Sequence, residues 1–291
     1  VVYNAEYGVI EVLNVMPNSP ADEGGLLPSD FIIAVGGESV SSLGYNEAIA
    51  KVRGEIGTDV TVTVARGENR SEQFDLTLTR RMVEEQSVTY ETIEVPTLTA
   101  PVAYIRLMDF NDTTASQFTE ALRRGQADRV HGYIVDVRNN GGGELSSILE
   151  ILDVLLPEGP IVRIQYKDGT EKVYESDEKE FKAPMVVLAN GNTASAAELF
   201  VSALKDYQKA IVVGTVTYGK GTVQSLIPFE DGSALRISTS MYAPPYSDNY
   251  EGVGITPDIE SELDEQYRGI NLFKLAHEND AQLQAALALY K

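Results

Sequence analysis

At residues 189–200 the sequence is Ala189-Asn190-Gly191-Asn192-Thr193-Ala194-Ser195-Ala196-Ala197-Glu198-Leu199-Phe200. The apolar run 184–188 before it is typical of a buried strand, and residues 196–206 after it carry apolar side chains at helical spacing. Ser195 is therefore expected where a core strand turns into a helix. Unpaired backbone N–H groups and the positive end of the helix dipole favour a nucleophile and an oxyanion at such a position. The alternative is that Thr193 or Ser195 only caps the helix.

The composition excludes several kinds of site. The 291 residues are enough for two domains, and 44 acidic against 23 basic side chains give a formal net charge of -21. This charge argues against nucleic acid and anionic membrane surfaces as partners. The absence of cysteine excludes thiol nucleophiles, disulfides and thiolate metal sites. Only His131 and His277 are present, which leaves little room for a Ser-His-Asp triad or a His-rich metal site.

The N-terminal sequence carries no targeting signal. No apolar run approaches the roughly 20 residues that a helix needs to cross a bilayer, and no signal peptide is evident. The chain begins with Val1-Val2-Tyr3, which is typical of the middle of a strand. We therefore expect a fragment that lacks its natural N-terminus, so that a membrane anchor is left open only through the missing segment.

Residues 1–82 predict a small β-rich domain. Apolar and polar residues alternate, as in strands, over 7–15, 59–64 and 74–78, whereas 45–52 has helical spacing. The order of elements resembles a PDZ domain of the bacterial protease type. The matching stretches are Asn18-Ser19-Pro20-Ala21, Gly25-Leu26, Ser29-Asp30-Phe31-Ile32, Val35-Gly36-Gly37 and Gly57-Thr58-Asp59-Val60.

The resemblance to a PDZ domain implies that residues 1–82 bind the C-terminus of an extended peptide as an added strand at a sheet edge. The loop that would hold the peptide carboxylate falls at or before residues 1–7, where we assign no residue. The family usually has Gly-Asp where this chain has Ser29-Asp30. The alternative is a PDZ domain that serves only as a structural brace.

The rest of the chain predicts a second domain with flanking segments. Residues 83–102 predict a polar, extended connector into it. Strands alternate with helices over 103–260, which predicts a layered α/β domain. Residues 261–291 predict a C-terminal helical segment that ends in a helix over 280–290, with a role in packing or subunit contact.

Three consecutive glycines, Gly141, Gly142 and Gly143, follow a buried strand at 131–138 and precede a helix at 145–156. Such a loop holds a phosphate or an oxyanion with its backbone N–H groups, or is only a tight turn. The phosphate interpretation is weak because the GxGxxG spacing and a following Lys-Ser/Thr are missing. Ser195 is expected at an equivalent strand-to-helix corner, so the two loops would meet at one edge of the sheet.

A serine nucleophile needs a base, and Lys220 is a candidate. It lies between two glycines, after the apolar strand 210–213. Burial without a counter-charge lowers the pKa of a lysine and leaves a neutral amine that can take a hydroxyl proton. Gln224, four residues further on, would share a face with Lys220 on an extended segment and orient the amine without charging it. The alternative is a surface turn.

Six stretches occur in the order, and at about the spacing, of one peptidase family. They are Asp136-Val137-Arg138-Asn139-Asn140-Gly141-Gly142-Gly143, Gly191-Asn192-Thr193-Ala194-Ser195-Ala196-Ala197-Glu198, Tyr218-Gly219-Lys220-Gly221-Thr222-Val223-Gln224, Asp231-Gly232-Ser233-Ala234-Leu235-Arg236-Ile237, Met241-Tyr242-Ala243-Pro244 and Gly252-Val253-Gly254-Ile255-Thr256-Pro257-Asp258. From Tyr7 to Asp258 the chain resembles the C-terminal processing peptidases (family S41). This resemblance implies a mixed α/β fold, with a β-rich PDZ domain and a layered α/β core of the ClpP/crotonase type.

The resemblance also implies site residues. Ser195 would be the nucleophile, Lys220 the general base and Gln224 the hydrogen-bond partner of that lysine. The backbone N–H groups of Ala196 and Gly142 would form the oxyanion hole. No metal or cofactor is implied.

Two positions depart from the family pattern. Gly141 stands where the family often has proline, which leaves the choice of oxyanion glycine open, and Ala197 stands where it often has serine. Asp136, Arg138 and Glu198 match the family, and we interpret them as structural supports.

We therefore expect a serine endopeptidase that cleaves proteins near their C-termini through an acyl-enzyme. Its partners would be proteins or peptides with free C-termini, a homo-oligomer is left open, and nucleic acid is not expected. The resemblance alone implies a location outside the cytoplasm, in the bacterial cell envelope or secreted. One rival is a catalytically silent PDZ peptide-binding protein on a protease-like scaffold. The other is a crotonase-like acyl-CoA enzyme, against which the PDZ domain and the segment with Lys220 and Gln224 count.

Overall fold

The computed structural model describes residues 1–4, 7–12, 15–16, 19–67, 70–83, 86–229, 233–267 and 272–290. These residues form two compact units. The first contains the described residues up to 83 together with 272–275, and the second contains those of 86–267 and 276–290. The predicted motif stretch at Asp231-Gly232 lies outside the described residues.

The first unit is an antiparallel sheet with short helices. Its strands are β1 (Val2–Asn4), β2 (Val9–Glu11), β3 (Phe31–Val35), β4 (Glu38–Ser39), β5 (Asp59–Arg66) and β6 (Glu72–Thr79), and its helices are α1 (Pro20–Glu23), α2 (Val40–Leu43) and α3 (Tyr45–Val52). The sheet has the order β1-β2-β3-β5-β6, with β4 paired to β3, so β1 lies at one edge. A cluster of buried aliphatic side chains, including Ile10, Val35 and Val64, forms a separate core for this unit.

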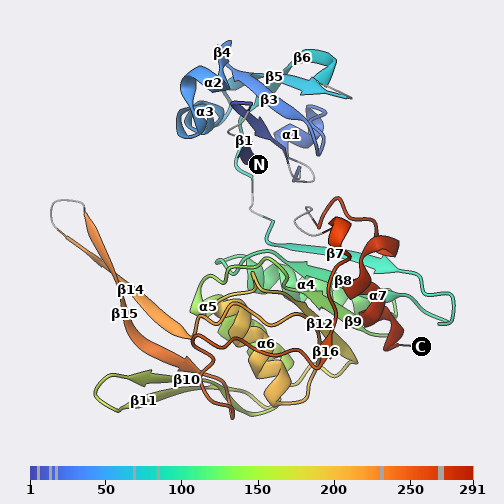
Figure 1. Ribbon diagram of the computed structural model, residues 1–291, viewed down its shortest axis with the longest axis vertical. Coiled ribbons are helices and arrows are strands. Elements are labelled where there is room, and N and C mark those ends of the chain that lie inside the picture. The colour runs from blue at the N-terminus through green and yellow to red at the C-terminus, as the bar shows by residue number, and fades with distance from the viewer. Residues whose placement is uncertain are drawn as a thin grey trace. The chain divides into compact units, whose positions relative to one another are not determined.

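The second unit is built on a sheet of order β16-β13-β12-β9-β8-β7 (Figure 1). Its strands are β7 (Val88–Ile93), β8 (Val102–Leu107), β9 (Tyr133–Asp136), β12 (Met185–Ala189), β13 (Ile211–Gly214) and β16 (Ile259–Glu260). All neighbours are parallel except β7, which pairs antiparallel with β8. Every residue of β8, β9 and β12 is buried, as expected for strands covered on both faces.

Helices cover both faces of this sheet. Side chains of α4 (Thr114–Ala127), α5 (Leu145–Leu155) and α6 (Ala196–Asp206) pack on one face in a large core that includes Ile105, Val135 and Val187. Side chains of α7 (Ala281–Ala288) pack on the other face with Tyr104, Ile134 and Leu188. These two sets alternate along the strands, so the alternating side chains of each strand fill two different cores.

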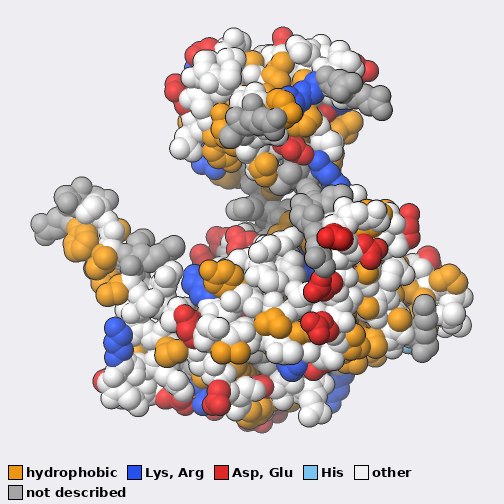
Figure 2. Space-filling model, in the orientation of Figure 1, with side chains coloured by type: hydrophobic (Ala, Val, Ile, Leu, Met, Phe, Trp, Pro, Cys, Tyr) orange, Lys and Arg blue, Asp and Glu red, His pale blue; other side chains and the backbone are white. Residues whose placement is uncertain are grey.

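A second sheet carries a projecting hairpin. Its strands β10 (Gly159–Tyr166), β11 (Glu171–Ser176), β14 (Thr222–Pro228) and β15 (Ala234–Ala243) have the order β11-β10-β15-β14. The hairpin of β14 and β15 extends away from the rest of the second unit (Figure 1). Apolar side chains are exposed along it, among them Ile227, Phe229, Leu235 and Ile237 (Figure 2). These side chains therefore add nothing to the cores described above.

The stretch 83–102, predicted as an extended connector, includes a strand of the core sheet. It contains β7, which pairs with β8 over its whole length, from Val88↔Leu107 to Ile93↔Val102. Backbone pairing, with Val88 buried at one end, outweighs the polar composition of this stretch. At the other end of the chain, the predicted helix over 280–290 is present as α7, with Asp280 as its N-cap. Within the described ranges, no helix is both long and apolar enough to span a bilayer.

The core of the second unit predicts the cost of a cavity in α5. Leu152 is fully buried there, so Leu152→Ala should lower the free energy of unfolding by about 2–5 kcal/mol. Glu150→Ala, an exposed position on the same helix, should change it by less than about 0.5 kcal/mol. Urea denaturation followed by circular dichroism measures both variants. Equal effects would contradict the assignment of this helix face to the core.

Candidate active site

Ser195 lies at the turn from β12 into α6, as predicted, and its backbone is unusual. Its dihedral angles are φ 58 and ψ -121, a region that residues other than glycine rarely occupy. Such a conformation costs about 1–3 kcal/mol and persists only where surrounding contacts enforce it. Ser195 is half-buried, whereas Ala196 and the rest of the first helical turn are buried.

The glycine-rich loop after β9 packs directly against Ser195. A Cβ atom added at Gly142, which has φ +104, would lie 2.8 Å from Ser195 Cβ and 2.9 Å from Ala196 N. At Gly143 it would lie 2.1 Å from the carbonyl oxygen of Phe110. Only glycine fits at these two positions, because a side chain would collide with backbone atoms. The two predicted loops therefore meet at one edge of the sheet.

Hydrogen bonds join the two loops along their length. Asn139 N donates to Asn190 Oδ1 (3.0 Å), and Asn190 Nδ2 donates back to Asn139 Oδ1 (2.9 Å). Ala194 N donates to the carbonyl oxygen of Asn140 (2.9 Å), and Thr193 Oγ1 donates to that of Val137 (2.8 Å). These contacts position the Ser195 turn against the glycine loop. Thr193 thus connects the two loops through its side chain, which is a different role from the helix cap that we considered as the alternative.

The two N–H groups proposed for an oxyanion hole differ in this structure. Gly142 N already donates to the buried Oδ1 of Asn140 (2.9 Å). Ala196 N has no hydrogen-bond partner in the part of the chain that the structure describes. Their assignment to an oxyanion hole stays a prediction.

Glu198 joins the nucleophile turn to the loop that carries Lys220. Its side chain is fully buried, and one carboxylate oxygen accepts from Thr217 Oγ1 (2.6 Å) and Gly219 N (2.6 Å). The other accepts from Ser195 N (2.9 Å) and Lys220 N (2.8 Å). One oxygen atom thus holds the backbone of both predicted catalytic residues. The Ser-x-x-Glu spacing, which is that of a capping box, is the sequence signal for this contact.

Lys220 is brought beside Ser195 by these backbone contacts, but the side chains do not bond. Among the described residues, no hydrogen bond joins Ser195 Oγ to Lys220 Nζ, or Lys220 Nζ to Gln224. Gln224 is exposed, and its register with β15 shifts by one residue between Val223 and Gln224, where Thr239 of β15 is the extra residue. That Gln224 shares a face with Lys220 stays a prediction. The catalytic roles of the three residues stay predictions.

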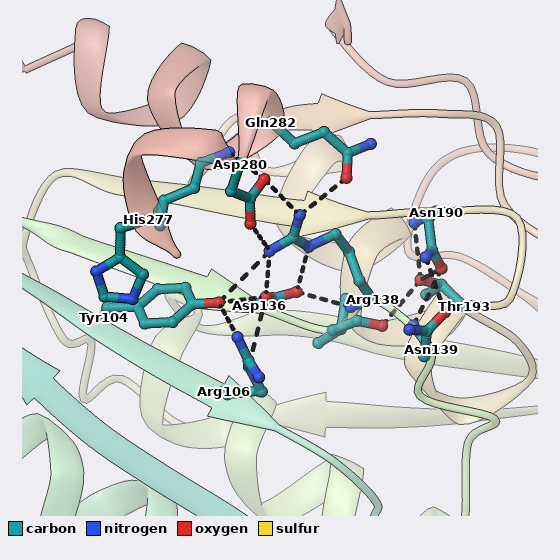
Figure 3. A network of polar contacts seen from close by, with 12 residues as sticks. Tyr104, Arg106, Asp136, Arg138, Asn139, Asn190, Thr193, His277, Asp280 and Gln282 are labelled. Atoms are coloured by element: carbon teal, nitrogen blue, oxygen red, sulfur yellow. Dashed lines mark hydrogen bonds and ion pairs between the residues drawn. The ribbon is translucent and has the colours of Figure 1, made fainter. Parts of the chain in front are cut away.

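Buried charges stabilise the end of β9 (Figure 3). Arg138 donates to both oxygens of Asp136 and to both oxygens of Asp280, the N-cap of α7. Burial alone would raise the pKa of Asp136, but the charges of Arg138 and Arg106 and hydrogen bonds from Arg138 and Tyr104 outweigh it and lower this pKa. Asp136 and Arg138 thus act as the structural supports that we predicted from the sequence. The contact of Asp280 with Arg138 was not predicted from the sequence, because 142 residues separate the two.

Within the described ranges, no cluster of three or more His, Asp or Glu side chains could hold a metal ion.

Comparison with protein families gives two matches. Residues 101–261 match the model of peptidase family S41, and residues 11–66 match the model of the PDZ domain. These matches confirm the resemblance inferred from the motifs. They also confirm the mixed α/β fold class, with a PDZ domain preceding a peptidase core.

Individual relatives agree with these matches. The chain is 33% identical over 278 residues to a carboxy-terminal-processing protease of Bartonella bacilliformis, covering 92% of this chain and 62% of that one. It is 34% identical over 289 residues to a carboxyl-terminal-processing protease of Synechocystis, covering 98% of this chain and 66% of that one. The chain thus spans less than two thirds of the length of these curated relatives.

Among solved structures, the photosystem II D1 C-terminal processing protease is similar. The two share 27% sequence identity and a TM-score of 0.58, over 97% of this chain and 76% of the other. Similarity thus extends through both units.

The four hydrogen bonds to Glu198 predict that its charge, and not only its shape, holds the 217–220 loop. Glu198→Gln should lower the free energy of unfolding by about 1.5–3 kcal/mol, because an amide nitrogen would face backbone donors. Hydrogen exchange at Gly219 and Lys220 should also accelerate. Glu251→Gln is the control, because Glu251 is exposed and accepts from Gly221 N in the neighbouring stretch. Equal exchange in the two variants would contradict the role of Glu198.

Proposed function

Because the chain belongs to peptidase family S41, we propose that it is a serine endopeptidase that cleaves proteins near their C-termini. One observation carries this proposal: the strained Ser195 turn is packed against Gly142 at the meeting point of two loops. A helix cap needs no left-handed backbone and no glycine loop against it. Both features bring a serine hydroxyl next to backbone N–H groups, which is the arrangement that a nucleophile beside an oxyanion hole uses.

The proposed reaction begins with Lys220 as general base. Its neutral amine takes the proton of Ser195 Oγ, and the oxygen attacks the carbonyl carbon of the scissile peptide bond. The tetrahedral intermediate collapses as the C–N bond breaks, and the protonated lysine gives its proton to the leaving amine. Water then attacks the acyl-enzyme, again with proton transfer to Lys220, and releases the carboxylic acid and free Ser195.

Substrate binding would complete the site. Catalytic hydrogen bonds are often long in the absence of substrate and shorten in the Michaelis complex. We propose that Lys220 Nζ reaches Ser195 Oγ, with Gln224 as its partner, when a peptide is bound. The oxyanion would accept from Ala196 N and from Gly142 N, which then exchanges its bond to Asn140 for the substrate oxygen.

The PDZ domain supplies the proposed recognition of the substrate C-terminus. The strand β1 lies at the edge of its sheet, so its outer backbone groups can pair with an added peptide strand. Tyr3 of β1 contacts Tyr45 at the start of α3, with ring centroids 5.9 Å apart. An extended peptide that adds to β1 would therefore meet these two rings, which favours apolar side chains near its C-terminus.

Removal of either member of the Ser-Lys pair tests the proposed function. Native protein should cleave casein, whereas Ser195→Ala should leave it intact, as judged by mass spectrometry. Lys220→Ala should lower kcat/KM by about 10²–10⁴-fold, because it removes the general base. Lys205→Ala, at the end of α6, is the control and should keep the native rate.

The outcomes separate the two interpretations of the chain. Cleavage that survives both Ser195→Ala and Lys220→Ala would overturn the proposed mechanism. Absence of cleavage by native protein, with and without peptides that have free apolar C-termini, would favour the silent PDZ-binding protein instead.

The glycine loop gives a second test with a matched control. Gly142→Ala should lower kcat by about 10²-fold or more, because the added Cβ displaces Ser195 and the oxyanion donors. Gly141→Ala should keep the rate within a few-fold of native, because a Cβ there meets no atom within 4 Å. Rates are measured on a fluorogenic peptide, with thermal melts to show that both variants are folded. A Gly142→Ala variant that keeps the native rate would contradict the proposed oxyanion hole.

A further inference from the structure

The C-terminal helix reaches the end of the strand that leads into the glycine loop. Asp280 is 3% exposed, and its Oδ1 and Oδ2 accept from Arg138 at 2.9 Å and 2.7 Å. Gln282 Oε1 accepts from the same guanidinium at 2.9 Å (Figure 3). Arg138 itself is 4% exposed, so these partners replace water almost completely.

Arg138 has partners on two sides. Asp136, on the same strand, accepts from Nε at 2.9 Å and from a terminal nitrogen at 2.7 Å. Asp280 and Gln282 approach from α7, which is fixed to the sheet by Leu283, Ala286 and Leu287. A guanidinium held by two carboxylates has a defined plane and position, because each pair of bonds is bidentate.

The position of Arg138 matters because the glycine loop begins directly after it. Asn139 is the next residue and exchanges hydrogen bonds with Asn190, before the Ser195 turn. Asn140 accepts from Ala194 N and also holds Gly142 N. A displaced Arg138 would therefore shift both loops that form the candidate active site.

We propose that Asp280 is a positioning residue of the active site, which holds Arg138 so that the 139–143 loop is in register with Ser195. The C-terminal helix is then a part of the active-site scaffold. This inference rests on the proposed peptidase function. Asp280 touches no reacting atom and acts only through Arg138.

The first pair of variants separates position from stability. Asp280→Asn keeps a good N-cap but loses the charge that Arg138 needs. It should lower kcat by about tenfold to 100-fold with KM within about twofold of native, measured well below its melting temperature. Leu287→Ala weakens the packing of the same helix without touching the Arg138 cluster. It should lower the melting temperature and keep kcat.

A second, milder pair keeps the inference testable if Asp280→Asn does not fold. Gln282→Ala removes one neutral contact to Arg138, whereas Gln284→Ala changes the same residue type two positions on, where it is exposed and bonds to His277. Gln282→Ala should lower kcat, and Gln284→Ala should not. If kcat follows the melting temperature in all variants, or if the variants at 280 and 282 keep native kcat, the inference is overturned.

Hydrogen exchange gives a readout that does not depend on activity. Amides of residues 139–143 should exchange faster in Asp280→Asn than in Leu287→Ala at the same temperature. Unchanged exchange at 139–143 would overturn the inference even if kcat fell. If native protein cleaves no substrate, the proposed function fails by itself, and this comparison still decides whether Asp280 holds the loop.

Discussion

The parallel pairing of β9 with β12 is the constraint on which the rest of the site depends. Neighbouring parallel strands end at the same edge of a sheet. The pair Asp136↔Leu188 therefore fixes where β9 and β12 end relative to each other. The glycine loop and the Ser195 turn then have to occupy the same space. Gly142 and Gly143 resolve this by presenting no side chain to the neighbouring backbone. The strained backbone of Ser195 is sustained by the same crowding.

Buried charged side chains also fix the backbone around the site. Two carboxylates act as fixed points: Glu198 collects donors from the Ser195 turn and the Lys220 loop, and Asp136 holds Arg138 at the end of β9. In each case an ionised acceptor stands where several donors converge, so the gain from charge-assisted bonds offsets the cost of burial. This arrangement fixes the backbone at Ser195, at Lys220 and at the end of β9.

The C-terminal helix α7 contributes to this polar cluster from the other face of the sheet. Its apolar side chains pack on the face opposite α4, α5 and α6, and Asp280 reaches the polar cluster at the strand end. Asp280 thereby connects the α7 face of the sheet, which has no part in the proposed chemistry, to the glycine loop, which does. His277 belongs to this region too, because its ring lies edge-on to Tyr104, 5.7 Å between centroids. The predicted role of this helix in packing is thus joined by a contact of its N-cap with Arg138.

Local sequence by itself determined much of this protein. Apolar runs and glycines lie close together in the chain, so they predicted the strand-to-helix corners and the two domains, with Ser195 and Lys220 as candidate site residues. The choice of Gly142 came from the family resemblance. Tertiary structure alone decided two things: that β7 joins the core sheet, and that Asp280 pairs with Arg138. Each depends on a partner outside the stretch of residues that forms the local pattern, and the pattern carries no record of such a partner.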